Sequence, residues 1–139
     1  MAATIRKMKI ADYEQALDLW QRTPGMGLSS ADEKGEIQKF LEKNSSLCYA
    51  AFADGALIGT ILCGEDGRRG YLYHLAVDVN YRETGIGKNL VQKSLQALHE
   101  LGIQKCHLFV ISDNTSGIAF WAHTGWELRK DIKIMSMTL

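Results

Sequence analysis

The sequence predicts an α/β (α+β) fold with a mixed, mostly antiparallel central sheet. Two observations carry this prediction. Three apolar, β-prone runs follow one another within 47–79, and an amphipathic helix then leads from the last of them into another strand. The length of 139 residues matches the commonest domain size, so we expect a single domain over 1–139. Apolar residues make up 46% of the chain, which is enough to fill a core without disulfide or metal support.

The N-terminal third is predicted to form one strand and two helices. Apolar residues up to Trp20 recur at helical spacing, and Pro24 then interrupts the pattern. Ser30 followed by Glu33 matches a capping box, which marks the start of a second helix. The predicted segments are a strand at 5–9, a helix at 11–22, a loop at 23–29 and a helix at 31–43.

Three consecutive antiparallel strands are predicted next. Asp54-Gly55 separates the runs 47–53 and 56–63, and this dipeptide between β-prone runs is the strongest short signal for a hairpin. A second, longer turn at 66–70 then leads into a strand at 71–79.

A βαβ unit follows. Residues 85–101 have apolar positions at helical spacing, and Gly102 ends the predicted helix. A strand at 105–111 then returns parallel to 71–79 through a right-handed crossover. The remaining segments are a short helix at 115–124 and a closing hairpin of strands at 126–129 and 132–139.

Charge and cysteine usage exclude several classes of function. The chain has 16 basic and 16 acidic residues, so no basic excess favours nucleic acid or an anionic membrane surface. The longest apolar run, 47–53, is far too short to cross a bilayer, and the N-terminus has no stretch resembling a signal peptide. We therefore expect a cytoplasmic protein. The three cysteines are widely separated and the histidines lack ligand spacing, so we expect no disulfide and no metal site.

The most informative segment is the turn that connects a predicted strand to a predicted helix, Arg82-Glu83-Thr84-Gly85-Ile86-Gly87-Lys88. Glycines allow close backbone approach, and a helix start offers unpaired N–H groups to a phosphate or pyrophosphate. A tight turn without a ligand is the alternative. The dinucleotide fingerprint fails at Leu90 and the P-loop pattern fails at Asn89. A nucleotide-binding protein that shares only the glycine turn remains a further alternative.

The surrounding residues resemble a known family. Leu75–Asp78 followed by Tyr81–Gly87 resembles motif A of the GNAT acetyltransferases, whose signature is Arg/Gln-x-x-Gly-x-Gly/Ala. Asn114 and the run Phe120–Trp126 resemble their second motif, Asn…Phe-Tyr-x-x-x-Gly-Phe. The motifs occur in the family's order, and the resemblance extends along the whole chain.

The resemblance implies a GNAT-like sheet of about seven strands with a splayed parallel pair (71–79 and 105–111) and about four helices. It also implies an acetyl-CoA-dependent N-acetyltransferase that needs no metal. The residues that would bind acetyl-CoA are Leu75, Ala76, Val77, Arg82, Glu83, Thr84, Gly85, Ile86, Gly87, Lys88, Asn114, Phe120 and Trp121.

The family's chemistry is direct attack of an amine on the thioester. Val77 occupies the position whose N–H polarises the thioester carbonyl. Tyr73 and His74 lie where many relatives place a catalytic group, although a core aromatic and a packed sheet histidine are alternative readings. Simple alternation puts the two on opposite faces of the strand, and a bulge in the family's strand would re-aim later residues. The family's usual tyrosine acid is replaced by Trp121, whose indole does not donate a proton near neutral pH, so another group serves or the thiolate leaves unassisted.

The acceptor is expected to be a primary amine of a small molecule or peptide. In relatives the loop between the first two helices walls the amine site, and here that loop, 23–30, is neutral. It therefore favours a small or mildly polar amine over a polyamine, an aminoglycoside or a basic peptide. A non-catalytic acyl-CoA-binding module is the alternative, because Trp121 and the missing base depart from the pattern. Homodimers are common in the family, so a homodimer stays open, although no unused apolar stripe indicates one.

Overall fold

The computed structural model describes residues 3–139. It divides into two compact units, one reaching to Phe109 and the other spanning Val110–Leu139. The elements of the first unit are β1 (Thr4–Lys7), the 3₁₀ turn η1 (Ile10–Asp12), α1 (Tyr13–Arg22), η2 (Ser30–Asp32), α2 (Lys34–Lys43), β2 (Tyr49–Ala53), β3 (Ala56–Glu65), β4 (Gly70–Val77), η3 (Val79–Tyr81), α3 (Ile86–Glu100) and β5 (Cys106–Leu108). The second unit contains α4 (Thr115–His123).

The sheet has five strands within the described residues, in the order β1-β2-β3-β4-β5. Neighbouring strands are antiparallel except β4 and β5, which are parallel and joined through α3. The predicted mixed α/β fold, its four α-helices and its parallel pair are therefore confirmed. The Asp54-Gly55 hairpin also forms as predicted, and both residues have positive φ, at 52° and 80°, as a type I′ turn requires.

The prediction of about seven strands is wrong, because the closing hairpin does not form. Residues 126–139 contain no strand. The connection between the two predicted strands is Lys130-Asp131, which lacks the glycine or asparagine that a tight hairpin turn favours. Arg129 instead forms an ion pair with Asp131, with Nη2 and Oδ2 2.8 Å apart. Apolar alternation alone does not specify a hairpin here.

The predicted capping box is displaced by one residue. Ser29 precedes η2, and its Oγ accepts a hydrogen bond from the Ala31 N–H at 3.2 Å. The Asp32 carboxylate accepts from the Ser29 N–H at 2.9 Å. The helix α2 itself begins later, after an extended Glu33. Asp32, rather than Glu33, is therefore the acidic partner in this turn.

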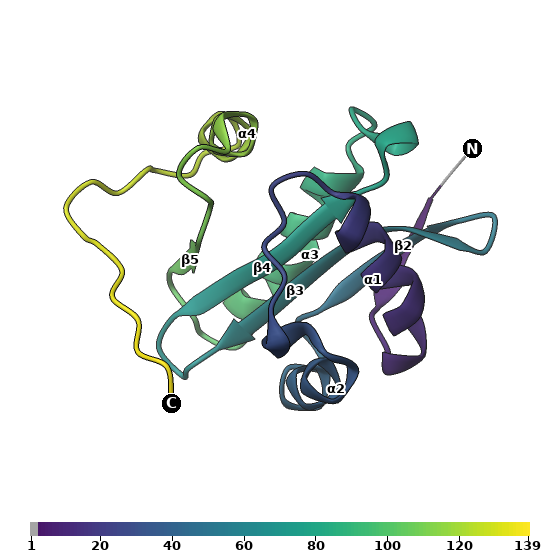
Figure 1. The fold of residues 1–139 in the computed structure, drawn as a ribbon, viewed down its shortest axis with the longest axis horizontal. Helices are drawn as coiled ribbons and strands as arrows, with labels where there is room; N and C mark the ends of the chain where they lie inside the picture. The colour runs from purple at the N-terminus through teal and green to yellow at the C-terminus, as the bar shows by residue number, and fades with distance from the viewer. Residues whose placement is uncertain (1–2) are drawn as a thin grey trace. The chain divides into compact units, whose positions relative to one another are not determined.

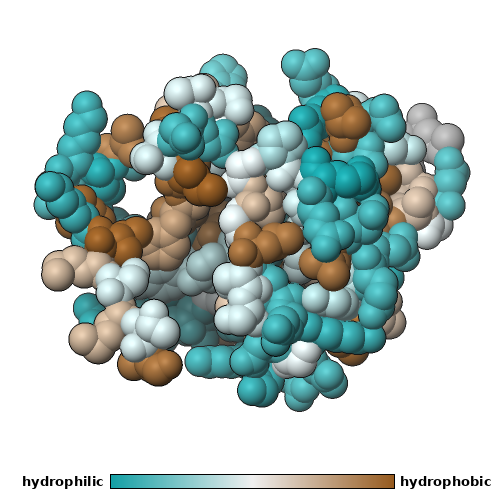
Figure 2. Space-filling model, viewed as in Figure 1, coloured by the Kyte–Doolittle hydropathy of each residue, from teal (hydrophilic) through white to brown (hydrophobic). Residues whose placement is uncertain are grey.

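The helices cover both faces of the sheet, with α1 and α2 on one face and α3 on the other (Figure 1). The amphipathic helices α1 and α2 bury their apolar stripes, and the surface above them in Figure 2 is mostly hydrophilic. Gly59 on β3 allows close packing of α3, because a Cβ there would lie 3.1 Å from Leu90 Cδ1. The buried side chains that the two helices α1 and α2 contribute are Tyr13, Ala16, Leu19, Trp20, Ile37 and Leu41.

A bulge interrupts β4 at His74. Between the pairs Thr60–Ala76 and Leu62–Tyr73, one residue of β3 lies opposite two residues of β4, so β4 contains one extra residue. His74 has a left-handed φ of 49°. The Thr60 hydroxyl is fully buried and donates to the His74 carbonyl at 2.9 Å.

The Thr60 hydroxyl also has a partner on α1. It accepts a hydrogen bond from Trp20 Nε1 at 2.8 Å. One side chain therefore holds both the bulge of β4 and the largest buried residue of α1. Buried polar groups of this kind are strongly destabilising when one partner is lost.

Replacing Thr60 tests this link. Thr60→Val keeps the shape but leaves the Trp20 indole N–H and the His74 carbonyl without their partner, so we expect the free energy of unfolding to fall by about 2 to 4 kcal/mol. Thr60→Ser keeps the hydroxyl and is expected to lose only about 1 kcal/mol. Urea denaturation followed by circular dichroism measures both. Equal stability of the two variants would show that the hydroxyl does not hold the bulge.

Candidate active site

The strand β4 runs past β5 for most of its length. The parallel pairing covers only residues 70–72 of β4, so residues 73–77 extend beyond it. The Asp78 N–H donates to the Ile58 carbonyl at 2.8 Å. Because successive amides of a strand point to opposite edges, the Val77 amide faces away from β3. This edge therefore offers strand-like hydrogen bonds to an extended ligand.

A 3₁₀ turn and a left-handed glycine connect β4 to α3. Asp78 caps η3 by accepting from the Asn80 N–H at 2.9 Å. Gly85, the N-cap of α3, has φ 86°, which suits glycine best. The first hydrogen bond of α3 runs from the Asn89 N–H to the Gly85 carbonyl at 3.0 Å, so the amides of residues 86–88 have no partner within the helix. Together with the helix dipole, these amides favour a bound anion.

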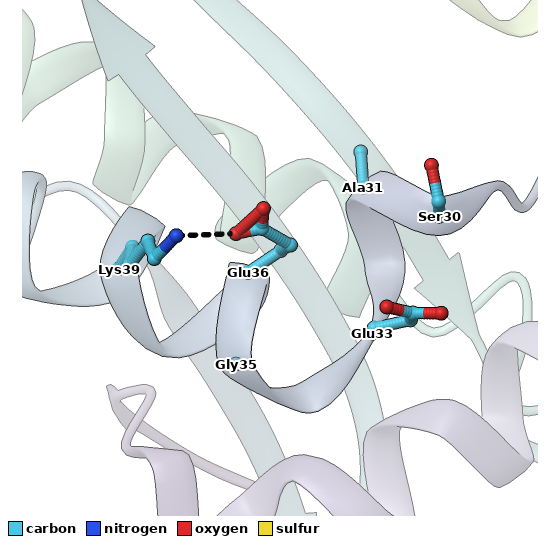
Figure 3. Close-up of a pocket in the computed structure, with 6 residues that line it drawn as sticks. All are labelled: Ser30, Ala31, Glu33, Gly35, Glu36 and Lys39. Carbon is cyan, nitrogen blue, oxygen red and sulfur yellow. Dashed lines mark ion pairs between the residues drawn. The ribbon is translucent and has the colours of Figure 1, made fainter.

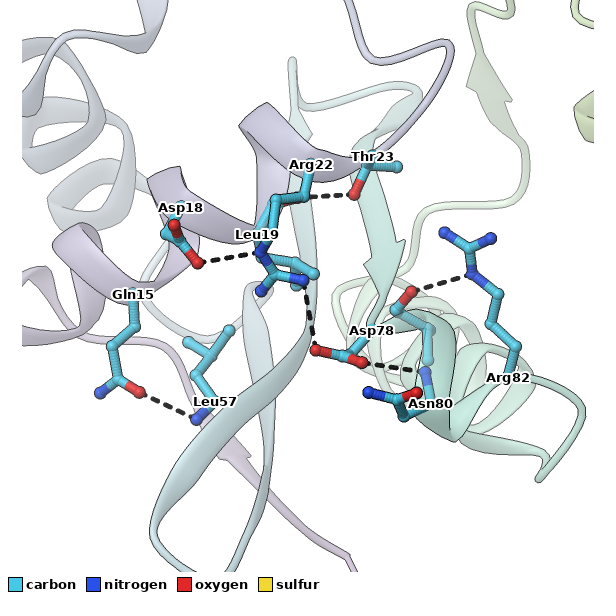
Figure 4. Close-up of polar contacts among 10 residues, drawn as sticks. Gln15, Asp18, Leu19, Arg22, Thr23, Leu57, Asp78, Asn80 and Arg82 are labelled. Atoms are coloured by element: carbon cyan, nitrogen blue, oxygen red, sulfur yellow. Dashed lines mark hydrogen bonds and ion pairs between the residues drawn. The ribbon is translucent and has the colours of Figure 1, made fainter.

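Two arginines approach the end of β4 from different elements (Figure 4). Arg82 Nε donates to the Val77 carbonyl at 3.1 Å, which places the guanidinium beside the free strand edge. Arg22, at the end of α1, contacts Asp18 at 3.0 Å and Asp78 at 3.3 Å. The second contact ties the end of α1 to the end of β4. Arg82 therefore brings positive charge to the same turn that exposes the helix amides.

His74 is held by three elements on the α1 face of the sheet. Its Nε2 lies 2.6 Å from Asp32 Oδ1 in η2. Its ring packs edge-on against Trp20, with the ring centroids 4.7 Å apart. Its carbonyl accepts from Thr60. The side chain is thus fixed in place beside the free half of β4.

Tyr73 belongs to an aromatic group on the same face. Its ring centroid lies 5.9 Å from that of Phe40 on α2 and 6.4 Å from that of Phe109. Burial raises the pKa of the Tyr73 phenol, and Tyr71 and Cys63 raise it further. Tyr73 therefore keeps its proton at neutral pH.

The bulge overturns the simple alternation predicted for β4. Tyr73 contacts α2 and His74 contacts α1 and η2, so the two side chains share one face instead of opposite faces. The extra residue in β4 is the physical reason. Of the other predicted residues on this strand, Ala76 is buried, while Leu75 and Val77 are half-buried.

The predicted residues of the second motif lie in the second unit. Asn114 caps α4 by accepting from the Gly117 N–H at 3.1 Å. The Trp121 ring packs edge-on against Phe120, at 5.1 Å between centroids, and against Trp126, at 5.2 Å. Within this unit the Asn114 side chain is thus engaged in helix capping and the aromatic residues in mutual packing.

Sequence reasoning missed Asp32. The spacing Ser29-x-x-Asp32 is itself a capping signal, but it does not indicate a contact with a residue 42 positions away. That contact depends on the β4 bulge and on the packing of η2 against the sheet. A long-range pair of this kind leaves no local pattern.

Two surface hollows lie away from the glycine turn. One, of about 420 Å³, is lined by Ser30 and Ala31 of η2 and by residues of α2 (Figure 3). Its Lys39 Nζ is paired with Glu36 at 3.0 Å. The other, of about 620 Å³, lies along the outer side of α3 beside Ile5. Neither hollow is lined by the residues of the glycine turn.

Within residues 3–139, no three His, Cys, Asp or Glu side chains come together in a way that could hold a metal ion. The helices of the same range are also too short or too polar to span a membrane.

A sequence model of the GNAT acetyltransferase family matches residues 13–126. The chain belongs to this family. It is therefore an N-acetyltransferase, and like other GNAT enzymes it uses acetyl-CoA as the acetyl donor. The matched range contains both β4 with its bulge and the glycine turn at the start of α3.

Individual relatives support the assignment. An acetyltransferase of Sodalis glossinidius is 28% identical over 135 residues, which cover 97% of this chain and 94% of the relative. One of Pectobacterium atrosepticum is 29% identical, covering 88% of this chain and 86% of the relative. The PaiA N-acetyltransferase of Thermoplasma acidophilum, solved in complex with coenzyme A, is similar in structure with a TM-score of 0.82. It is 25% identical and covers 95% of this chain and 94% of that one. Ard1 from Thermoplasma volcanium shares the fold, with a TM-score of 0.82 and 21% identity over 93% of this chain and 85% of that one.

Proposed function

We propose that this GNAT enzyme transfers the acetyl group of acetyl-CoA to a primary amine of a small molecule or peptide, and that the residues around the end of β4 bind the donor. The proposal rests mainly on the fact that two candidate binding features, a strand edge and a helix N-terminus, follow each other directly along the chain. The free edge of β4 leads directly into a left-handed Gly85 and the unpaired amides of α3. An extended arm followed by a pyrophosphate requires these two features in that order.

The proposed contacts rest on the family resemblance and agree with this geometry. The edge at 75–77 would hold the pantetheine arm by backbone hydrogen bonds, and the segment 82–88 would hold the pyrophosphate through its amides and Arg82. The Val77 N–H would polarise the thioester carbonyl as negative charge develops on its oxygen. Asn114, Phe120 and Trp121 of the second motif remain part of the proposal through the family resemblance.

The proposed chemistry assigns roles to two neighbouring side chains. Acetyl-CoA supplies an activated acetyl group whose carbon–sulfur bond breaks as a carbon–nitrogen bond to the amine forms. His74 would accept the proton that the attacking amine loses. Tyr73, whose pKa is raised by burial, would donate a proton to the departing sulfur in place of the residue replaced by Trp121. Because a free thiol has a pKa of about 8.5, the thiolate is a stable leaving group and its departure depends only weakly on this proton.

The acceptor class rests on the segment between α1 and α2. Its neutral loop favours a small or mildly polar amine. A suitable panel contains 2-phenylethylamine and tetra-alanine, with spermidine and kanamycin as multiply charged amines. Release of thiol from acetyl-CoA reports turnover, and we expect higher kcat/KM for the first two compounds. Fast turnover of spermidine or kanamycin would contradict this acceptor class.

Isothermal titration tests donor binding. We expect micromolar affinity for acetyl-CoA and none for ATP at the same concentrations. Arg82→Ala should weaken acetyl-CoA binding about tenfold, because a charge-assisted contact is lost. Arg68→Ala, at the hairpin between β3 and β4, removes an equal charge elsewhere and should leave binding unchanged. An absence of heat with the circular dichroism spectrum intact would mean that the turn binds no donor, and preference for ATP would support a nucleotide site instead.

A matched glycine pair separates folding from binding. Gly85 and Gly102 have nearly equal φ, at 86° and 84°, and a Cβ on either would meet no atom within 4 Å. Alanine at each position should therefore lower stability alike, by about 1 to 2 kcal/mol. Only Gly85→Ala should also weaken acetyl-CoA binding, because only Gly85 positions the proposed anion site. Thermal denaturation and titration of both variants give the comparison, and equal affinities would contradict the site.

A further inference from the structure

We propose that Asp32 is a positioning residue for His74. The Asp32 carboxylate fixes the imidazole tautomer with the proton on Nε2 and leaves Nδ1 as the proton acceptor. This inference rests on the proposed role of His74 in acetyl transfer. It adds a residue of η2, between α1 and α2, that lies outside both family motifs of the chain.

The geometry of the pair determines which nitrogen carries the proton. A carboxylate oxygen is only an acceptor, so His74 Nε2, 2.6 Å from Asp32 Oδ1, must be the donor. In the neutral ring Nδ1 is then the nitrogen with a free lone pair. Nδ1 has no hydrogen-bond partner in residues 3–139, and it is not fully buried. It therefore keeps contact with solvent while Nε2 is occupied.

Asp32 is itself held firmly. Its side chain is 11% exposed and that of His74 is 15% exposed, so the contact is largely shielded from water. Asp32 Oδ2 accepts from the Ser29 N–H at 2.9 Å. The Asp32 carbonyl accepts from the Tyr13 hydroxyl at 2.7 Å. The two carboxylate oxygens thus have separate partners, one in the turn and one on the imidazole.

The backbone of His74 is strained in a way that serves this contact. A left-handed φ of 49° is unfavourable for a histidine, and such strain persists where the surroundings over-determine it. Thr60 holds the carbonyl and Trp20 supports the ring. The imidazole reaches Asp32 from within residues 73–77, the half of β4 that extends past β5.

The position of Asp32 couples two parts of the enzyme. The turn η2 adjoins loop 23–30, which would wall the proposed amine site, whereas His74 belongs to the strand that would bind the donor. The orientation of the proposed base therefore depends on the conformation of the turn that carries Asp32. Nuclear magnetic resonance of the imidazole nitrogens and steady-state kinetics test the role of Asp32.

The first measurement is the tautomer of His74 by ¹⁵N–¹H correlation of the imidazole rings, with His74→Gln used to assign the signals. We expect the Nε2–H form in the wild type. Asp32→Asn offers one acceptor oxygen for two donors, and its amide can donate to the ring, so we expect a shift toward the Nδ1–H form. Ser29→Ala removes the other capping contact of η2 but keeps Asp32, so its tautomer should match the wild type. A mixture in the wild type, or no change in Asp32→Asn, would overturn the proposal.

The second measurement is kcat, with acetyl-CoA and the panel amine that the wild type turns over fastest. Asp32→Asn should lower kcat about 10- to 100-fold, with KM for acetyl-CoA within about twofold, whereas Asp66→Asn, which makes the same change in the hairpin between β3 and β4, should leave kcat unchanged. Unchanged kcat in Asp32→Asn would overturn the positioning role. If His74→Gln keeps full kcat, the proposed base is wrong. If no amine is turned over, the proposed acceptor class fails, and the tautomer alone then decides whether Asp32 fixes His74.

Discussion

The candidate site depends on one buried hydroxyl, that of Thr60. It joins α1, β3 and β4 by accepting from the Trp20 indole and donating to the His74 carbonyl. A β4 strand without the bulge would place Tyr73 and His74 on opposite faces, and the pair could not act on one substrate. The hydroxyl lies in the core, where an unpaired polar group is expensive, so the network is stable only when all of its members are present.

The proposed donor site lies along the part of β4 that does not pair with β5. Three residues of β5 pair with the start of β4, and the remaining strand edge continues into the glycine turn. In the proposed site, backbone amides would supply most of the binding groups, and Arg82 would add positive charge. The contacts from Arg82 to Val77 and from Arg22 to Asp78 then fix the end of β4 relative to α1 and α3. The fold thus brings the proposed base and the proposed oxyanion donor onto the same short strand.

Local signals predicted most of the first unit, and long-range contacts account for what they missed. Asp54-Gly55 specified its hairpin because its two positive φ angles are a property of those residues alone. The βαβ unit followed from helical periodicity and from the strands on either side. The hairpin expected over 126–139 failed because alternation was not accompanied by a turn signal. The pair formed by His74 and Asp32 was invisible, since it depends on a bulge and on segments 42 positions apart.

Acetyl-CoA is proposed to bind along the end of β4 and at the start of α3. Backbone amide chemical shifts of ¹⁵N-labelled protein, recorded during titration with acetyl-CoA and separately with ATP, test it most directly. We expect the largest shift changes with acetyl-CoA to fall within 75–77 and 83–88, and we expect ATP to leave the shifts of these amides unchanged. Shifts centred on the hollow at η2 and α2, or an equal response to ATP, would contradict it.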